Sequence, residues 1–273
     1  VKRKFNGRVV TIGRTANLTE PIESQNRGKC MYRSQCDRGC SYGAYFSTLS
    51  STLPAAAKTG NLTTKADTIV ASLVFDDKKK KITGINAIDI KSKKLYKIKS
   101  RAVFLCASTV ASIQILFNSK SHSMPNGLGN NYDILGRYLM DHTFGTGATG
   151  ILPFYNEYIE YGRRPTGMYI PRFRNLKNDQ DKHEFVRGYN FQSWGQGRVP
   201  PQDINGFGEE LKKNLRIPGP WRLPLHAFCE ILPRKSNRIL VDDNKVDQYG
   251  IPQVKLEFEW SENEINMLKD ATE

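Results

Sequence analysis

The sequence predicts a mixed fold: an α/β part that contains an antiparallel meander, followed by an α+β part built on an antiparallel sheet. Three observations lead to this prediction. An apolar run at residues 102–107 leads directly into a helical pattern at 108–119. Strand-like segments joined by short connections precede that run. After His142 the strand-like pieces are separated by loops rich in Pro and Gly, which places the domain boundary between residues 142 and 143.

Residues 102–107 read Ala-Val-Phe-Leu-Cys-Ala, a continuous apolar run that is typical of a strand buried on both faces of a parallel sheet. Ser108 is the expected N-cap of the following helix. Ligands bind at the carboxyl ends of such strands, and helix-start N–H groups favour anions such as phosphate. Because most capped strand–helix junctions bind nothing, the junction alone leaves both interpretations open.

The amino-terminal part is expected to hold a short strand at residues 8–12 and a structured loop at 30–42, which contains three cysteines and Gly39 and is followed by Gly43. Those glycines permit close approach of the backbone to a ligand, and a tight loop packed on its own cysteines is the equal alternative. A helix is expected over 43–58, interrupted at Pro54.

Three segments, at residues 67–75, 81–90 and 95–99, have strand-like composition, and their short connections predict an antiparallel meander. After the expected helix at 109–119, a loop at 126–131 leads into a short helix predicted over 132–140.

The second half predicts a mainly antiparallel sheet with peripheral helices. Its strand-like pieces are residues 168–173, 185–191, 225–232 and 254–260. Gly145, Gly147 and Gly150 are expected in a loose stretch that joins the two domains. Ser261 and Glu264 form a capping-box pattern that predicts the start of a further helix.

The chain is basic, with 41 Lys and Arg against 27 Asp and Glu, a formal net charge of +14. Such an excess suggests nucleic acid or another acidic partner. However, the densest run, Lys78 to Lys81, lies between two expected strands, where a solvated hairpin tip is typical. Nucleic acid is therefore not predicted as a partner, although a basic binding module without catalysis is kept as the alternative function.

Cysteine and histidine usage predicts no metal site. Cys30, Cys36 and Cys40 lack the close paired spacing of common zinc sites, and no fourth ligand is evident. Cys106 and Cys229 lie in apolar runs, where free Cys behaves as a small hydrophobic residue.

His142 follows Asp141 at the expected end of a helix, where both the carboxylate and the helix terminus favour the charged imidazole. A catalytic role is open, but a lone His-Asp pair specifies no reaction, so a structural role is favoured. His226, in an apolar strand, is expected to be a core histidine. Neither a nucleophile elbow, nor a His-Glu-x-x-His motif, nor a Walker loop occurs in the sequence.

Five blocks of the sequence, taken together and in order, resemble one enzyme family. They are residues 36–44 with 50–56, residues 60–69, residues 104–112, residues 135–142, and residues 232–252. The resemblance is to the glucose-methanol-choline (GMC) family of flavin oxidoreductases, and within it to a bacterial branch similar to gluconate dehydrogenases.

The resemblance implies FAD as cofactor, a partial Rossmann-like FAD-binding domain at residues 1–142 and a partial substrate domain at 143–273. Ile69 matches a position whose backbone meets the adenine. The remaining residues that the resemblance places at the cofactor are Gly39, Cys40, Gly43, Ala44, Ala107 and Ser108. Ser108 stands where the family usually has Gly, which weakens the match at that turn.

The implied reaction is oxidation of an alcohol or sugar hydroxyl by hydride transfer to the flavin. Its implied partners are the small alcohol or sugar and an electron-acceptor protein or subunit. The family's Gly-x-Gly-x-x-Gly loop and late catalytic His are not visible in the sequence. We therefore expect the middle of a longer enzyme, with catalytic residues outside this chain, that alone neither binds FAD tightly nor turns over substrate. No apolar segment is long enough to cross a bilayer, and we predict a soluble protein of the bacterial cytoplasm or periplasm.

Overall fold

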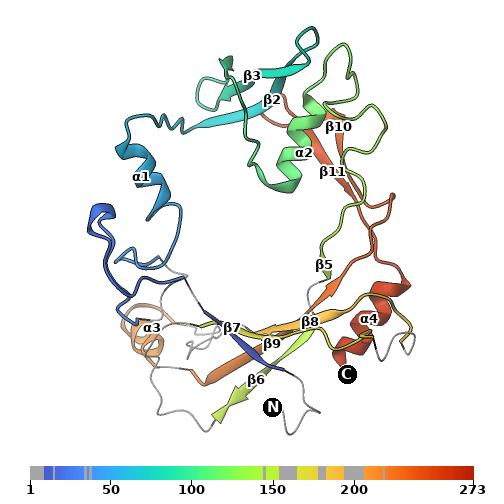
Figure 1. The fold of residues 1–273 in the computed structure, drawn as a ribbon. Helices are drawn as coiled ribbons and strands as arrows, with labels where there is room; N and C mark the ends of the chain where they lie inside the picture. Colours follow the sequence, from blue (N-terminus) through green and yellow to red (C-terminus); the bar gives the residue numbers. More distant parts are fainter. Residues whose placement is uncertain are drawn as a thin grey trace. The chain divides into compact units, whose positions relative to one another are not determined.

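A computed structural model of the chain describes most of its residues and divides them into two compact units (Figure 1). The described residues are 9–14, 16–33, 36, 39–143, 146–153, 165–177, 183–193, 206–217 and 219–273. The first unit comprises Val1–Thr63, His142–Ile231 and Ser261–Glu273, and the second comprises Thr64–Asp141 and Leu232–Trp260. Each unit is thus built from segments that are separated in the sequence. The assignment of 1–142 to a flavin domain and of 143–273 to a substrate domain stays a prediction.

The first unit contains an antiparallel sheet in the order β1-β7-β8-β9-β5, with β6 also paired to β9. Its strands are β1 (Thr11–Arg14), β5 (His142–Thr143), β6 (Gly147–Leu152), β7 (Pro165–Ile170), β8 (Tyr189–Ser193) and β9 (Trp221–Glu230). The helices of this unit are α1 (Thr52–Lys58), α3 (Gly208–Leu215) and α4 (Glu262–Thr272), with a 3-10 turn at Glu23–Gln25. The antiparallel sheet predicted for the second half of the sequence is therefore confirmed.

Helix α4 packs against β8 and β9 and forms the core of the first unit (Figure 1). The core contains Tyr189, Ala227 and Cys229 from the sheet and Met267 and Ala271 from the helix. The predicted start of α4 is confirmed, because the buried Glu264 carboxylate accepts the backbone N–H of Ser261 at 2.7 Å. Cys229 is fully buried, as its apolar surroundings predicted.

The second unit contains the predicted meander, formed by β2 (Thr68–Asp76), β3 (Lys81–Asp89) and β4 (Leu95–Lys99). Helix α2 (Ser108–Asn118) packs against β2 and against the hairpin of β10 (Arg238–Val246) and β11 (Pro252–Glu257). The exposed Lys78 to Lys80 lie in the β2–β3 turn and Lys81 begins β3. Asp76 Oδ1 accepts the N–H groups of Lys78 and Lys79, each at 3.0 Å. The hairpin-tip interpretation of this basic run is confirmed.

A short stretch of backbone pairing, which we call the junction, joins residues 136–139 to residues 237–239 in the second unit. Ile239 N–H donates to Gly136 O at 2.8 Å, and Leu139 N–H donates to Asn237 O at 2.9 Å. Gly136 has φ +77°, and a Cβ there would lie 2.2 Å from Ile239 O, so only glycine fits.

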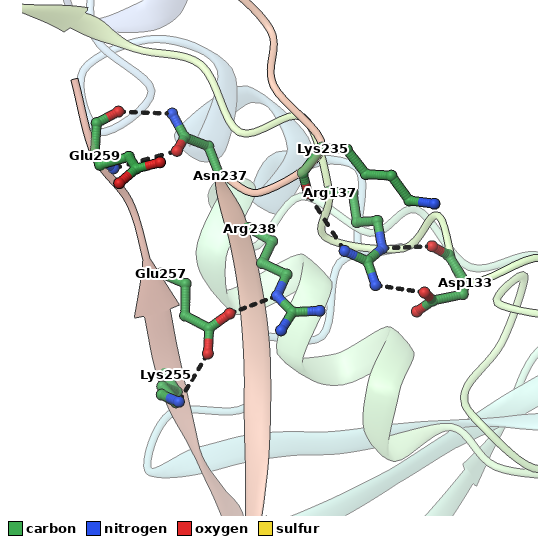
Figure 2. Close-up of polar contacts among 8 residues, drawn as sticks. All are labelled: Asp133, Arg137, Lys235, Asn237, Arg238, Lys255, Glu257 and Glu259. Atoms are coloured by element: carbon green, nitrogen blue, oxygen red, sulfur yellow. Dashed lines mark hydrogen bonds and ion pairs between the residues drawn. The ribbon is translucent and has the colours of Figure 1, made fainter. Parts of the chain in front are cut away.

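The fully buried Asn237 fastens the junction to the strand end at Glu259. Its Nδ2 donates to Glu259 O at 3.1 Å, and its Oδ1 accepts Glu259 N–H at 3.2 Å. Figure 2 shows these two hydrogen bonds together with ion pairs from Arg238 to Glu257 (2.6 Å) and from Lys255 to Glu257 (2.7 Å). These ion pairs are partly exposed and contribute little to stability. The hydrogen bonds of the buried Asn237 amide therefore contribute more.

The predicted buried strand at residues 102–107 is wrong. These residues adopt no strand, Phe104 is 89% exposed, and Cys106 is exposed rather than packed in apolar surroundings. A strand exists only where a neighbour exchanges backbone hydrogen bonds with it, and no described strand pairs with this segment. The Rossmann-like part of the fold prediction is therefore not shown, whereas the mixed α/β character is.

The predicted helix at 132–140 is also wrong. Asp133, Gly136 and Tyr138 have φ values of 55°, 77° and 59°, which a right-handed helix excludes. Gly147 and Gly150 lie in β6 rather than in a loose linker, and Gly145 lies outside the described residues.

Two further differences have local causes. The helix predicted over 43–58 is limited to Thr52–Lys58, and Pro54 lies in its first turn, where a missing N–H costs nothing. Strand β10 was not predicted because its second half, Asp242 to Lys245, has the composition of a turn.

In the described parts of the chain, no helix combines the length and the apolar character needed to cross a membrane.

We expect Asn237→Ala to lower the free energy of unfolding by roughly 1–3 kcal/mol, because it leaves the N–H and C=O of Glu259 without their partner. Urea denaturation followed by circular dichroism measures this loss. Asn244→Ala, at an exposed position of the same hairpin, is the matched control and should change stability by less than about 0.5 kcal/mol. Equal effects of the two substitutions would contradict the role given to Asn237.

Candidate functional site

The seven residues predicted to contact a cofactor fall in both units, so each group is described by itself. Gly39, Cys40, Gly43 and Ala44 belong to the first unit, and Ile69, Ala107 and Ser108 belong to the second. Their contact with a cofactor stays a prediction, and the local geometry defines what each group can do chemically.

The first group forms a tight turn whose backbone N–H groups surround a thiol. Gly43 N–H donates to Cys40 O at 2.9 Å, and Gly43 has φ +62°. Burial raises the pKa of Cys40, but the backbone N–H groups of Tyr45, Tyr42, Ala44 and Gly43 outweigh burial and lower it below the ordinary thiol value. The turn therefore stabilises negative charge at its centre.

Arg27 stabilises this turn through a hydrogen bond. The buried Arg27 donates through Nε to Gly43 O at 2.8 Å, and a Cβ at Gly43 would lie 3.3 Å from Arg27 Cγ. Ala44 is only 1% exposed, so its side chain faces the interior. Gly39 differs from Gly43, since a Cβ there would meet nothing within 4 Å. Gly39 is thus the position of this group that has open space beside it.

Two of the three predicted loop cysteines lie close to a single amide. Asn17 Nδ2 is 3.4 Å from Cys30 Sγ and 3.7 Å from Cys36 Sγ. Cys30 and Cys36 therefore lie around the same amide, while residues 34–35 and 37–38 of the loop lie outside the described residues, and both interpretations of the loop stay predictions.

In the second unit, Ile69 lies near the start of β2, opposite Ile88 of β3. Among the described strands β2 pairs with β3 alone, so it is an edge strand. An edge strand keeps backbone donors and acceptors on its outer side, and these suit recognition of a flat, hydrogen-bonding ring.

Ala107 and Ser108 begin α2 in an unusual way. Ala107 is the N-cap residue, no side chain caps the helix, and Ser108 has φ +65°. The prediction that Ser108 caps this helix is therefore wrong, because Ser108 is itself the first residue of α2 and no side chain accepts an N–H of the first turn. The N–H groups of that turn receive no side-chain cap, which is the condition for accepting an anionic group there.

Sequence reasoning missed a set of side chains on the first unit's sheet, which we call the polar face. In β8 and β9, Tyr189 and Ala227 face α4, so the alternate residues Asn190, Gln192 and His226 face the opposite side. Gln192 lies opposite His226 in the sheet, and Gln192 Nε2 donates to Asn190 Oδ1 at 3.1 Å. The alternation in Tyr-Asn-Phe-Gln at 189–192 was the sequence signal for this face.

The surroundings of His226 and His142 therefore differ from those that the sequence predicted. His226 is half-buried on the polar face rather than in the core. His142 lies in β5 opposite Glu230, with its ring edge-to-face against Phe228 at 5.9 Å, and no helix precedes it. The argument from a helix terminus for a charged His142 is thus wrong.

Comparison with known proteins places this chain among flavin-type oxidoreductases. The profile of GMC oxidoreductases matches residues 4–144. The chain is 25% identical over 192 residues to 2-methyl-1,2-propanediol dehydrogenase of Mycolicibacterium austroafricanum, a match covering 68% of this chain and 34% of that protein. It is 20% identical over 240 residues to the fructose dehydrogenase large subunit of Gluconobacter japonicus, covering 86% and 42% respectively. The chain thus spans less than half the length of either relative.

We expect Cys40 to be alkylated by iodoacetamide at lower pH in the native protein than in the urea-unfolded protein, because the thiolate is the reactive form and the backbone N–H groups stabilise it. Rates for the Cys40 peptide, followed by mass spectrometry across a pH series, give the midpoint in each state. The buried Cys229 serves as a control, since its thiol is inaccessible in the native protein and should be alkylated only in the unfolded protein. Identical native and unfolded midpoints for Cys40 would refute the stabilising turn.

Ser108→Gly is expected to raise the free energy of unfolding by up to about 1 kcal/mol, because it removes the cost of a left-handed conformation at a residue with a Cβ. The matched control is Ser112→Gly, in the middle of the same helix, which should lower stability by roughly 0.5 kcal/mol. Thermal unfolding of both variants compares them directly, and destabilisation by both would argue against the strained turn.

Proposed function

Because the chain belongs to the GMC oxidoreductase family, we propose that it is part of an FAD-dependent dehydrogenase that oxidises a hydroxyl-bearing carbon of a small alcohol or sugar. The match of the family profile over residues 4–144 carries this proposal. The names of the relatives, a diol dehydrogenase and a fructose dehydrogenase subunit, support a polyhydroxylated substrate. The name of the fructose dehydrogenase large subunit also supports a further subunit as a partner.

The residues present fit FAD by their backbone chemistry. The uncapped first turn of α2 at Ala107 and Ser108 offers N–H groups to a phosphate, and the outer edge of β2 at Ile69 offers backbone groups to the adenine. The turn at Gly39 to Ala44 would lie near the flavin, where its N–H groups favour electron density. When bound, FAD would supply the acceptor for the substrate's hydride.

The polar face is the part of the chain that we assign to the substrate. Amide side chains such as Asn190 and Gln192 both donate and accept hydrogen bonds, which suits hydroxyl groups that do the same. Their positions on alternate residues of a paired strand hold them rigidly, and Gln192 is already oriented by Asn190. Residues 143–273 would thus contribute to a substrate domain and residues 1–142 to a flavin domain. No proton acceptor is assigned within this chain.

The test uses the natural full-length protein that contains this sequence. Purified protein should show the visible absorption of bound flavin, and this absorption should bleach when fructose or 2-methyl-1,2-propanediol is added without oxygen. A panel of further sugars and diols extends the search for the substrate. A protein that lacks flavin, and that instead binds DNA with an affinity falling linearly against log salt, would overturn the proposal in favour of a basic binding module.

With a substrate identified, we expect Gln192→Ala to raise KM by about two- to tenfold, the usual effect of losing one neutral hydrogen bond. The flavin content should stay unchanged, because Gln192 is assigned to the substrate and not to the cofactor. Gln253→Ala, at a position of β11 in the second unit, is the control and should leave KM unchanged. An unaltered KM in the Gln192 variant would remove the polar face from the substrate site.

A further inference from the structure

The second unit contains a cavity of about 430 Å³ between the meander, the end of α2 and the β10–β11 turn. This volume lies within the range of small-molecule sites. We propose that this cavity is a binding site for a sugar-sized anion, a molecule with several hydroxyl groups and one carboxylate or phosphate. It would be a binding function in addition to the proposed oxidation.

The walls of the cavity are fixed by contacts between the elements that form it. Gln114 of α2 donates to Pro252 O at 2.7 Å, which holds the β11 end of the wall to the helix. Ser119, at the end of α2, accepts the N–H of Leu73 at 2.7 Å through its hydroxyl and so holds the helix to β2. A preformed cavity loses little conformational freedom when a ligand enters.

The charges at the cavity favour an anion. Lys93 and Lys120 contribute two ammonium groups to the lining, against the one carboxylate of Asp243. Lys120 pairs with Asp243 at 3.2 Å, whereas Lys93 forms no ion pair with any residue that the structure describes. Lys97 lies opposite Asn86 in the β3–β4 pairing and therefore on the same face of the meander. The cavity thus carries an excess of positive charge beside it.

The remaining lining suits a hydroxylated carbon skeleton. Asn86 Nδ2 donates to Ser72 Oγ at 2.9 Å, so these two side chains present an oriented pair of polar groups. Ile88 of β3 and Ile251 of the β10–β11 turn provide apolar surface in the lining. Sugars combine hydrogen-bonding edges with apolar C–H faces, so a lining of this kind fits a sugar ring, and Lys93 selects a ring that also carries a negative group.

Isothermal titration with three matched probes tests this proposal: glucose, glucuronate and glucose 6-phosphate, which differ only in the group at C6. At least one of the two anions should bind about tenfold or more tightly than glucose, the gain expected from one charge-assisted hydrogen bond. The preferred anion identifies the acidic group as carboxylate or phosphate. Equal binding of all three probes, or binding of none, would overturn the proposal.

Variants locate the binding within the cavity. Lys93→Gln should remove most of the advantage of the anion, and Lys93→Arg should retain it. Lys78→Gln makes the same charge change at the exposed β2–β3 turn, outside the cavity lining, and should have no effect. If Lys93→Gln leaves the affinity unchanged, or if Lys78→Gln weakens it equally, the anion binds elsewhere and the assignment of the cavity is wrong.

Discussion

The second unit depends on the junction, in which the backbone of Gly136 to Leu139 pairs with that of Asn237 to Ile239. Bringing two such distant segments together costs loop-closure entropy, which a few backbone bonds must offset. Most of the pairing is indifferent to side chains, with two exceptions. Gly136 must be glycine because Ile239 O approaches its Cα closely, and Asn237 must carry an amide because it is buried against the backbone of Glu259.

The junction holds together the second unit, which contains β2 and the start of α2. Helix α2 lies against both the meander and the β10–β11 hairpin, which fixes its uncapped amino terminus. The turn around Cys40 in the first unit likewise depends on backbone N–H groups, which converge there on the sulfur. Both arrangements rely on backbone N–H groups rather than on reactive side chains.

The positive charge of the chain is distributed according to strand geometry. Lysines occupy the β2–β3 turn and exposed positions along β4, where they keep the meander's outer edge from pairing with other chains. A net charge of +14 therefore needs no nucleic acid to explain it. Lys93 and Lys120 line a cavity of the second unit, and charge confined beside polar and apolar walls can select a ligand.

The sequence by itself determined the elements whose causes are local: the three meander strands, the Asp76 turn, and α4 with its Ser261–Glu264 box. It also determined the family, through short blocks kept in order. Tertiary structure decided the rest. An apolar run at 102–107 is a strand only if a neighbour pairs with it, and the left-handed residues Asp133 and Tyr138 flank a glycine whose conformation the junction imposes. The alternation of polar and apolar residues in β8 predicts a polar face. Only the packing of α4 decided which face of the sheet is buried, because burial is set by contacts between segments distant in the sequence.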